Sequence, residues 1–185
     1  MNEPAVELSD NGQLPEGDIR GMQILNAAFI AGLLMFVGVV ILLYFTAEEP
    51  KVPRGGETSL EHFQLLSIVN AVVFILISTA AFFIYRLRLA PIEKACSDSP
   101  QAEPGEFSGE IKGAFILRLS MLGAPGSLGT VVCFLGATGS EIHDHPIYWL
   151  NLLSPIAAIT LLGVTFPTQE KFARLFSVEK KSLYR

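Results

Sequence analysis

Four long stretches of the chain are almost free of charged residues, and polar connections separate them. Each stretch is apolar around its whole circumference, whereas a surface helix of a soluble protein buries a single apolar stripe. The apolar residues also do not alternate with polar ones, as they would in a transmembrane β-barrel. The pattern therefore predicts an all-α, polytopic membrane protein with a bundle of four transmembrane helices. The predicted spans are residues 22–46, 60–85, 111–138 and 146–166.

The first predicted span is roughly 37 Å long at about 1.5 Å per residue, which exceeds the ~30 Å hydrocarbon core of a bilayer. The membrane domain as a whole covers residues 22–166. Outside the spans lie an acidic tail (1–21), an inner loop (86–110) and a basic tail (167–185). Apolar residues at helical spacing in the basic tail fit either a short amphipathic helix on the inner leaflet or a frayed continuation of the fourth span. The acidic tail lacks the features of a secretory signal, so the first span is predicted to be retained.

Lys and Arg are distributed unequally between the two sides of this bundle. Ten of them lie on the side of both termini and two lie on the opposite side. Because basic residues accumulate on the cytoplasmic side of a membrane, both termini are predicted to be cytoplasmic, in a bacterial cytoplasmic (inner) membrane. The ten are Arg20, Arg86, Arg88, Lys94, Lys112, Lys171, Arg174, Lys180, Lys181 and Arg185, and the two are Lys51 and Arg54.

Composition agrees with this class of protein. Hydrophobic residues make up 50% of the chain and charged residues 17%, whereas soluble domains carry roughly 25% charged residues. The net charge of −5 resides in the loops and tails, so no nucleic-acid partner is expected. Cys96 and Cys133 fall at opposite membrane levels, too far apart for a disulfide, which needs Cα atoms within about 7 Å. Both are predicted to be free thiols.

The third span is rich in small residues and contains a proline. Gly123 and Ser127 are four residues apart, and Gly126 is close by; small residues at such spacing allow two helices in a membrane to approach closely. Pro125 should kink the span, because it removes one helical hydrogen bond. We prefer a tightly packed central helix to a broken helix that lines a substrate path, since glycine and proline are ordinary in membrane helices.

Arg118 is the one ionisable residue well inside a predicted span. Charged residues at membrane depth are often functional. However, the long side chain of Arg118 could snorkel to the headgroups, or contact Asn26 of the first span or Ser78 and Thr79 of the second. The structural interpretation is preferred.

Three histidines, His62, His143 and His145, lie at the outer edge of the predicted bundle. With neighbouring carboxylates they could bind a divalent metal ion. Alternatively, Asp144 or His145 caps the start of the fourth helix, and Pro146 takes its first position. An HxH pair alone is a weak signal, so we prefer the cap. The spans contain no deep Asp or Glu that could serve a proton-coupled pump, and no metal, cofactor or catalytic site is predicted.

Two functions fit these features. The first is a small non-enzymatic membrane protein that acts as an accessory or scaffold subunit of a larger membrane assembly. Its partners would be the lipid bilayer and either other membrane subunits or further copies of the same chain. The alternative is an oligomeric transporter or channel with a polar path. The path would be lined by Asn26, Asn70, Ser120, Ser127, Asn151 and Ser154.

The second half of the chain, residues 111–171, resembles a family of uncharacterised bacterial four-helix membrane proteins. The resemblance lies in Arg118 followed seven residues later by Pro125, and in a Pro-Thr step at Pro167 with charges after it. Members of that family often carry a Glu two residues before the first proline, where this chain has Gly123. The resemblance implies a four-helix membrane fold and no known activity.

Overall fold

The structure, a computed structural model, describes residues 14–46, 57–98, 104–139 and 141–172. Within these ranges the elements are all helical and no strand occurs, which confirms the all-α prediction. Four segments are long and apolar enough to cross a membrane: Glu16–Thr46, Glu61–Ala95, Ser108–Thr138 and Pro146–Val164. The elements are α1 (Glu16–Thr46), α2 (Glu57–Asp98), the 3-10 helix η1 (Pro104–Phe107), α3 (Ser108–Gly139), α4 (Glu141–Asp144), the 3-10 helix η2 (Pro146–Leu152) and α5 (Leu153–Val164).

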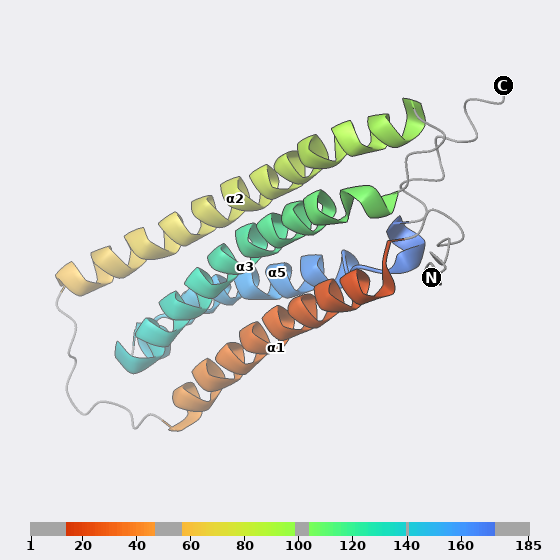
Figure 1. Ribbon diagram of the computed structural model, residues 1–185. Helices are drawn as coiled ribbons and strands as arrows, with labels where there is room; N and C mark the ends of the chain where they lie inside the picture. Colours follow the sequence, from red (N-terminus) through yellow and green to blue (C-terminus); the bar gives the residue numbers. More distant parts are fainter. Residues whose placement is uncertain (1–13, 47–56, 99–103, 140, 173–185) are drawn as a thin grey trace, which may run out of the picture.

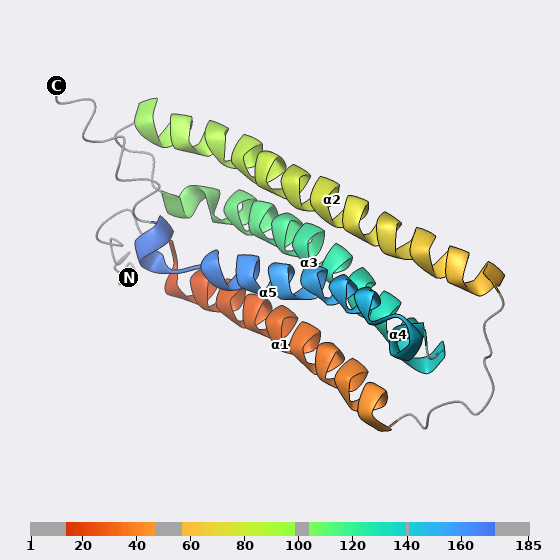
Figure 2. The same ribbon diagram turned by 180° about the vertical axis from the view of Figure 1, so that it is seen from behind.

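The helix α3 forms the centre of the bundle. It lies between α1 and α2 in both ribbon views, and α5 packs behind it in Figure 1, against α3 and α1 (Figures 1 and 2). In the most apolar 18 residues of each helix, 56% are buried in α3 but only 11% in α1 and in α2. We call the end at which α1 and α3 begin the terminal end, and the opposite one the distal end. Because α1 and α2 stand on opposite sides of α3, α2 packs mainly against α3.

Two apolar clusters hold the helices together. One lies in the terminal half and includes Ile111, Leu122 and Leu162, and the other lies in the distal half around Val40 and Val132. All five side chains are at most 2% exposed. Close packing of this kind supplies the dispersion contacts that hold helices together where the solvent is itself apolar.

The helix α2 is longer than predicted. Residues 86–110 were expected to form a loop, but α2 continues to Asp98 through Pro91. Leu89 and Ile92 of this extension are buried in the terminal cluster. Their packing offsets the unfavourable effect of a proline inside a helix, which is about 3 kcal/mol. The prediction of a loop was therefore wrong for residues 86–98, and residues 104–110 are helical too, in η1 and the first turn of α3.

The helix α1 begins at Glu16, inside the segment 1–21 that was predicted to be a tail. Glu16 and Asp18 in its first turn are favoured by the positive end of the helix dipole, and Ile19 is buried against the terminal cluster. Sequence hydropathy marks where a helix becomes apolar, and not where its backbone starts. The amphipathic segment predicted in the basic tail covers residues 168–178, of which residues 173–178 lie outside the described residues.

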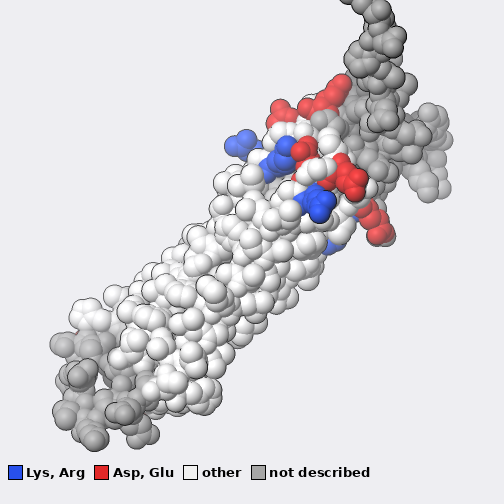
Figure 3. Space-filling model, turned by 60° about the horizontal axis from the view of Figure 1, so that its bottom comes forward, with Lys and Arg blue, Asp and Glu red and all other residues white. Residues whose placement is uncertain are grey.

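The surface of the bundle is apolar over most of its length. On the face shown in Figure 3, charged side chains gather at the terminal end and the remainder of the described surface is uncharged. Large apolar side chains stand on the outside, among them Met35 at 71%, Phe45 at 78% and Leu87 at 71% exposure. Apolar surface in water is unfavourable by about 25 cal/mol per Å², and hydrocarbon removes that penalty. This surface indicates a membrane protein.

Candidate functional site: a groove between α2 and α5

Two prolines shape the start of the last membrane-length segment. Pro146 opens η2, and Pro155 lies in the first turn of α5, where it has no N–H group to donate. The carbonyl of Asn151, four residues before Pro155, therefore lacks its helical donor. The hydroxyl of Ser154 donates to this carbonyl instead, at 3.0 Å. As a result, Asn151 and Ser154 lie together, both buried, at the junction of η2 and α5.

The side-chain amide of Asn151 is fully engaged. Its Nδ2 donates to the carbonyl of Tyr148 at 3.0 Å and to the Oγ of Ser67 on α2 at 2.9 Å. The Ser67 hydroxyl in turn donates to the carbonyl of Phe63 at 3.0 Å. Two backbone carbonyls, which can only accept, thus end this chain of bonds and fix its direction. The Oδ1 of Asn151 is left as an acceptor.

Asn70 of α2 supplies the donor that this acceptor needs. Its Nδ2 lies 3.1 Å from the Oδ1 of Asn151 and 3.4 Å from the Oγ of Ser154. This orientation of the Asn70 amide leaves its own Oδ1 without a hydrogen-bond partner among the described residues. Asn70 is only 2% exposed. A buried, unpaired amide oxygen typically destabilises a protein by about 1–3 kcal/mol.

Glycine on α3 makes room for this junction. A Cβ atom at Gly129 would overlap the Oγ of Ser154 and would lie 2.6 Å from the carbonyl oxygen of Asn151. Further along α3, at Gly136, a Cβ atom would lie 2.6 Å from Phe63 of α2 and 2.8 Å from Ile142 of α4. The absence of side chains at these two positions lets η2, α4 and α2 approach the backbone of α3 closely.

The amide and hydroxyl groups lie at a groove of about 680 Å³ between α2 and the η2–α5 segment. Its walls are mostly apolar, and several wall residues stand on the molecular surface, including Ile75 at 63%, Ile147 at 67% and Leu153 at 59% exposure. The groove therefore opens sideways, toward the surroundings of the bundle. The lining residues are Gln64, Ser67, Ile68, Asn70, Ala71, Phe74, Ile75, Ile147, Tyr148, Leu150, Asn151, Leu153, Ser154 and Ala157.

The groove is lined by uncharged groups that can form hydrogen bonds. Among the described residues that line it, none is charged and none is a histidine or cysteine. The hydroxyls of Ser67 and Ser154 both donate to backbone carbonyls, and neither has a base beside it that could activate it as a nucleophile. The arrangement can hold a molecule in a defined orientation.

Arg118 occupies the interface between α3 and α2. Its guanidinium carbon lies 5.0 Å from the ring centre of Phe82 and 4.6 Å from that of Tyr85, which are cation–π distances. The side chain is 8% exposed, and its Nε has no hydrogen-bond partner in the described part of the chain. The predicted partners of Arg118 are engaged elsewhere or unpaired: Asn26 donates to Leu162, Thr79 donates to Ile75, and the Ser78 hydroxyl has no hydrogen-bond partner among the described residues. Arg118 lies on two aromatic rings instead.

The predicted packing residues of α3 separate into two groups. Gly123 lies against Phe29 of α1, where a Cβ atom would be 2.7 Å from the ring, and Gly126 lies against Ala158 of α5, where it would be 2.8 Å from the Cβ atom. Pro125 between them is buried. Ser127, which was expected to share the face of Gly123, is instead exposed, and its hydroxyl donates to the carbonyl of Gly123 in its own helix at 3.0 Å.

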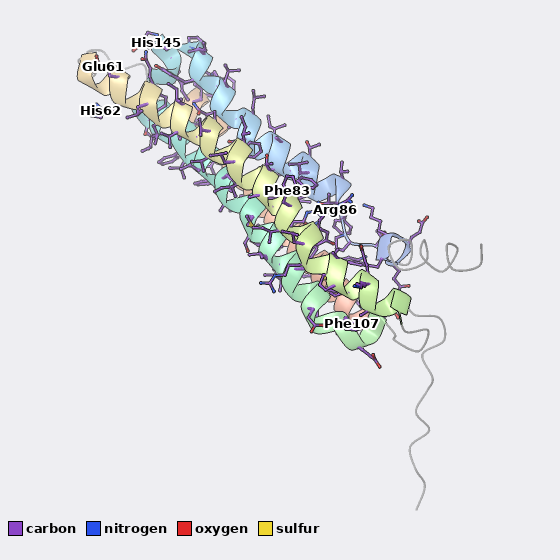
Figure 4. All side chains as sticks on the ribbon, turned by 90° about the horizontal axis from the view of Figure 1, so that it is seen from above. Glu61, His62, Phe83, Arg86, Phe107 and His145 are labelled. Atoms are coloured by element: carbon purple, nitrogen blue, oxygen red, sulfur yellow. The ribbon has the colours of Figure 1, made fainter. Side chains whose placement is uncertain are left out.

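The histidines gather at the distal end, where Figure 4 shows His62 and His145 near the beginning of α2 and of η2. The ring of His143 stacks on Tyr44 of α1 at 4.3 Å, and Tyr44 also contacts Trp149. His145 lies beside Tyr148, 6.0 Å between ring centres. In the described ranges, no three His, Cys, Asp or Glu side chains come close enough together to hold a metal ion. Pro146 takes the first position of η2, as predicted, and His145 precedes it without a side-chain capping bond. Of the two predicted caps, Asp144 or His145, the one by His145 is therefore wrong.

The polar residues of the predicted path do not form one line. Asn70, Asn151 and Ser154 belong to the groove, but Asn26 lies apart and donates to the carbonyl of Leu162 at 3.0 Å, near the end of α5. There it satisfies a backbone group that the ending helix leaves open. Two further members of the predicted set are exposed on the outside of α3, namely Ser120 and Ser127.

Ser67 and Gly129 are site residues that sequence reasoning had not assigned to this cluster. A signal for Ser67 was present, because it precedes Asn70 by three residues, just as Asn151 precedes Ser154 by three. Two polar residues three apart lie on one face of a helix. Nothing in the sequence distinguishes Gly129 from the other glycines of α3.

No protein-family model, curated protein or solved structure matches this chain. The resemblance noted for residues 111–171 therefore stays a prediction.

Proposed function

We propose that this protein is a non-enzymatic accessory subunit of a larger membrane assembly, and that it holds a component of the bilayer in the groove between α2 and α5. The observation that carries this proposal is the polar floor of the groove. Amide and hydroxyl groups of Asn70, Asn151 and Ser154 lie beneath apolar walls that open to the side. Buried polar groups inside a membrane are unfavourable unless they are paired, and they usually mark a functional site.

A binding role fits the groove better than a catalytic one. The hydroxyls of Ser67 and Ser154 are engaged with backbone carbonyls, and among the described lining residues there is no Asp, Glu, His, Cys, Lys or Arg. The groove would bind a molecule and release it without changing it chemically. Its transformation or transfer would belong to a partner, which is why the role is that of an accessory subunit.

The proposal includes a location. The four membrane-length helices cross a bacterial cytoplasmic membrane, with the terminal end in the cytoplasm. The distribution of Lys and Arg in the sequence supports this orientation, and so do the Lys and Arg side chains that Figure 3 shows at the terminal end. In this orientation the groove opens into the outer half of the bilayer.

The rival function is an oligomeric transporter or channel. It would need a continuous polar route, but Asn26 caps α5 while Asn70 and Asn151 bond to each other elsewhere. One copy of the chain therefore provides two separate polar clusters, and a route would have to be completed between copies.

Purification from native membranes in polymer-bounded lipid discs tests the proposal. An accessory subunit should carry foreign membrane polypeptides with it at a fixed ratio. Recovery of this chain alone, as a homo-oligomer with a water-filled central cavity, would contradict the proposal and favour the rival.

A further inference from the structure

Arg118 carries a positive charge that no described residue neutralises. Its guanidinium group stays protonated in proteins. Within the described ranges no carboxylate forms an ion pair with it, and its neighbours are the rings of Phe82 and Tyr85. Cation–π contact with two rings offsets only part of the unfavourable effect of removing an ion from water. A cation in this position therefore needs an anion from outside the described chain.

The guanidinium group also has unused hydrogen-bond donors. An arginine side chain carries five N–H groups, and the Nε of Arg118 is buried without a partner among the described residues. The Tyr85 hydroxyl lies beside the group as an acceptor, but one hydroxyl oxygen accepts at most two hydrogen bonds. Phe82, which contacts the guanidinium group, is 41% exposed and Arg118 itself is 8% exposed. Arg118 thus lies at the rim of the α2–α3 interface, where an acceptor from outside the chain can meet it.

The guanidinium group lies where the apolar part of the bundle ends. Its carbon atom is 4.6 Å from the ring centre of Tyr85, and the charged part of α2 begins at the next residue, Arg86. Tyrosine at such a boundary is typical of the headgroup level of a membrane. Arg118 starts deeper in α3, and side chains of a helix point back toward its N-terminus, which for α3 is the terminal end. The long side chain therefore delivers its charge to headgroup depth.

We infer that Arg118 binds the phosphate of an anionic phospholipid at the rim between α2 and α3. The planar fork of guanidinium donors matches the oxygen atoms of a phosphate. Residues 86–94 of α2 add three basic side chains against one acidic one, and this positive region favours a headgroup with net negative charge over a zwitterionic one. Phe83 lies close to Arg86 on α2 (Figure 4) and is 69% exposed, so it offers apolar surface to an acyl chain. This site is separate from the groove between α2 and α5.

Competition between two lipids tests the ligand. The full chain is placed in nanodiscs with equal amounts of dioleoylphosphatidylglycerol and dioleoylphosphatidylcholine, and the retained lipid is counted by native mass spectrometry. Both lipids share the acyl chains and the phosphate, and they differ in net charge. We expect phosphatidylglycerol to be retained about fivefold over phosphatidylcholine, the effect of one charge near a basic surface.

Two results of the same experiment would contradict this. Equal retention of the two lipids would overturn the inference and leave a carboxylate on a partner's helix as the counter-ion of Arg118. Soluble glycerol phosphate, added in equal amount, should not displace the lipid because it has no acyl chains. Displacement would assign the site to a free phosphate and not to a lipid.

Paired variants test the residue. Arg118→Met replaces a buried ion by an unbranched apolar side chain, a change that proteins often tolerate, and Arg20→Gln removes an exposed charge of α1 at the same end. Arg118→Met should abolish the preference for phosphatidylglycerol, and Arg20→Gln should keep it at about fivefold. Arg118→Lys, which keeps the charge, should retain part of the preference. Equal preferences in the Met and Gln variants, or a Lys variant as low as the Met variant, would overturn the inference.

A further variant separates this site from the groove. Ile75→Trp fills the groove between α2 and α5, which Ile75 lines, and Ile75 lies seven residues from Phe82 along α2. The preference for phosphatidylglycerol should therefore survive this substitution. Its loss in Ile75→Trp would show that the anionic lipid occupies the groove, and would overturn the assignment to Arg118.

Discussion

Replacement of Gly129 by alanine should destabilise the protein far more than the same change at Gly113. The added methyl group at Gly129 would overlap the Oγ of Ser154 and would lie 2.6 Å from the carbonyl oxygen of Asn151 and 3.1 Å from Pro155. Backbone and proline ring cannot rotate away, so η2 and α5 have to shift from α3. At Gly113 nothing lies within 4 Å of the added methyl group.

The magnitude follows from three effects. Overpacking a core destabilises by about 1–3 kcal/mol. Displacement of the Ser154 hydroxyl leaves the Asn151 carbonyl unpaired next to Pro155, at about 1–3 kcal/mol. Alanine is the better helix former by about 1 kcal/mol, which offsets part of the loss. We therefore expect Gly129→Ala to lower the free energy of unfolding by about 3 kcal/mol, and Gly113→Ala to leave it unchanged or to raise it by up to about 1 kcal/mol.

The assay is unfolding in mixed micelles by titration with SDS. Trp149, the single tryptophan of the chain, lies in η2 and contacts Tyr44 of α1, so its fluorescence reports on the segment that has to move. A midpoint for Gly129→Ala equal to that of Gly113→Ala would refute the close approach of η2 to α3, and with it the geometry of the groove.

Three further predictions concern other parts of the chain. Asn26→Leu leaves the buried carbonyl of Leu162 without its donor, so the free energy of unfolding should fall by about 1–3 kcal/mol; an unchanged SDS midpoint would contradict that bond. Elemental analysis of the dialysed protein should find no stoichiometric metal, and near-stoichiometric zinc that a His143→Ala/His145→Ala variant loses would contradict this. Single introduced cysteines outside the described residues test the orientation with an impermeant thiol reagent on intact cells, and the reverse pattern would show that it is inverted. The cysteines of Gly55→Cys and Ser140→Cys should react with the reagent, and the cysteine of Ser99→Cys should not.

Local composition was sufficient to predict the helices but not their ends. The hydropathy of a segment depends only on its own residues and not on its neighbours in the fold. Four membrane-length helices can therefore be predicted from sequence alone. The continuation of α2 through Pro91 depends on Leu89 and Ile92 packing against other helices. That contact joins residues distant in sequence, and hydropathy does not encode it.

The site was predictable in its members but not in its arrangement. Asn70 and Asn151 stand out as polar residues within apolar spans, and both were predicted to line the polar path of the alternative function, a transporter or channel. Their direct hydrogen bond requires η2 to lie against α2, and Gly129 allows the same segment to lie close to α3. Arg118 shows the same limit, because its aromatic neighbours come from another helix.

The central claim is tested most directly by measuring the mass of the protein after it is extracted from its native membrane. Native mass spectrometry of protein extracted in lipid discs, without added ligand, should detect one small apolar molecule retained per chain. The Leu76→Trp variant should retain it and the Ile75→Trp variant should lose it, because only Ile75 lines the groove. A wild-type chain that carries no retained molecule, or two variants that retain it equally, would contradict the claim that the groove between α2 and α5 is a binding site.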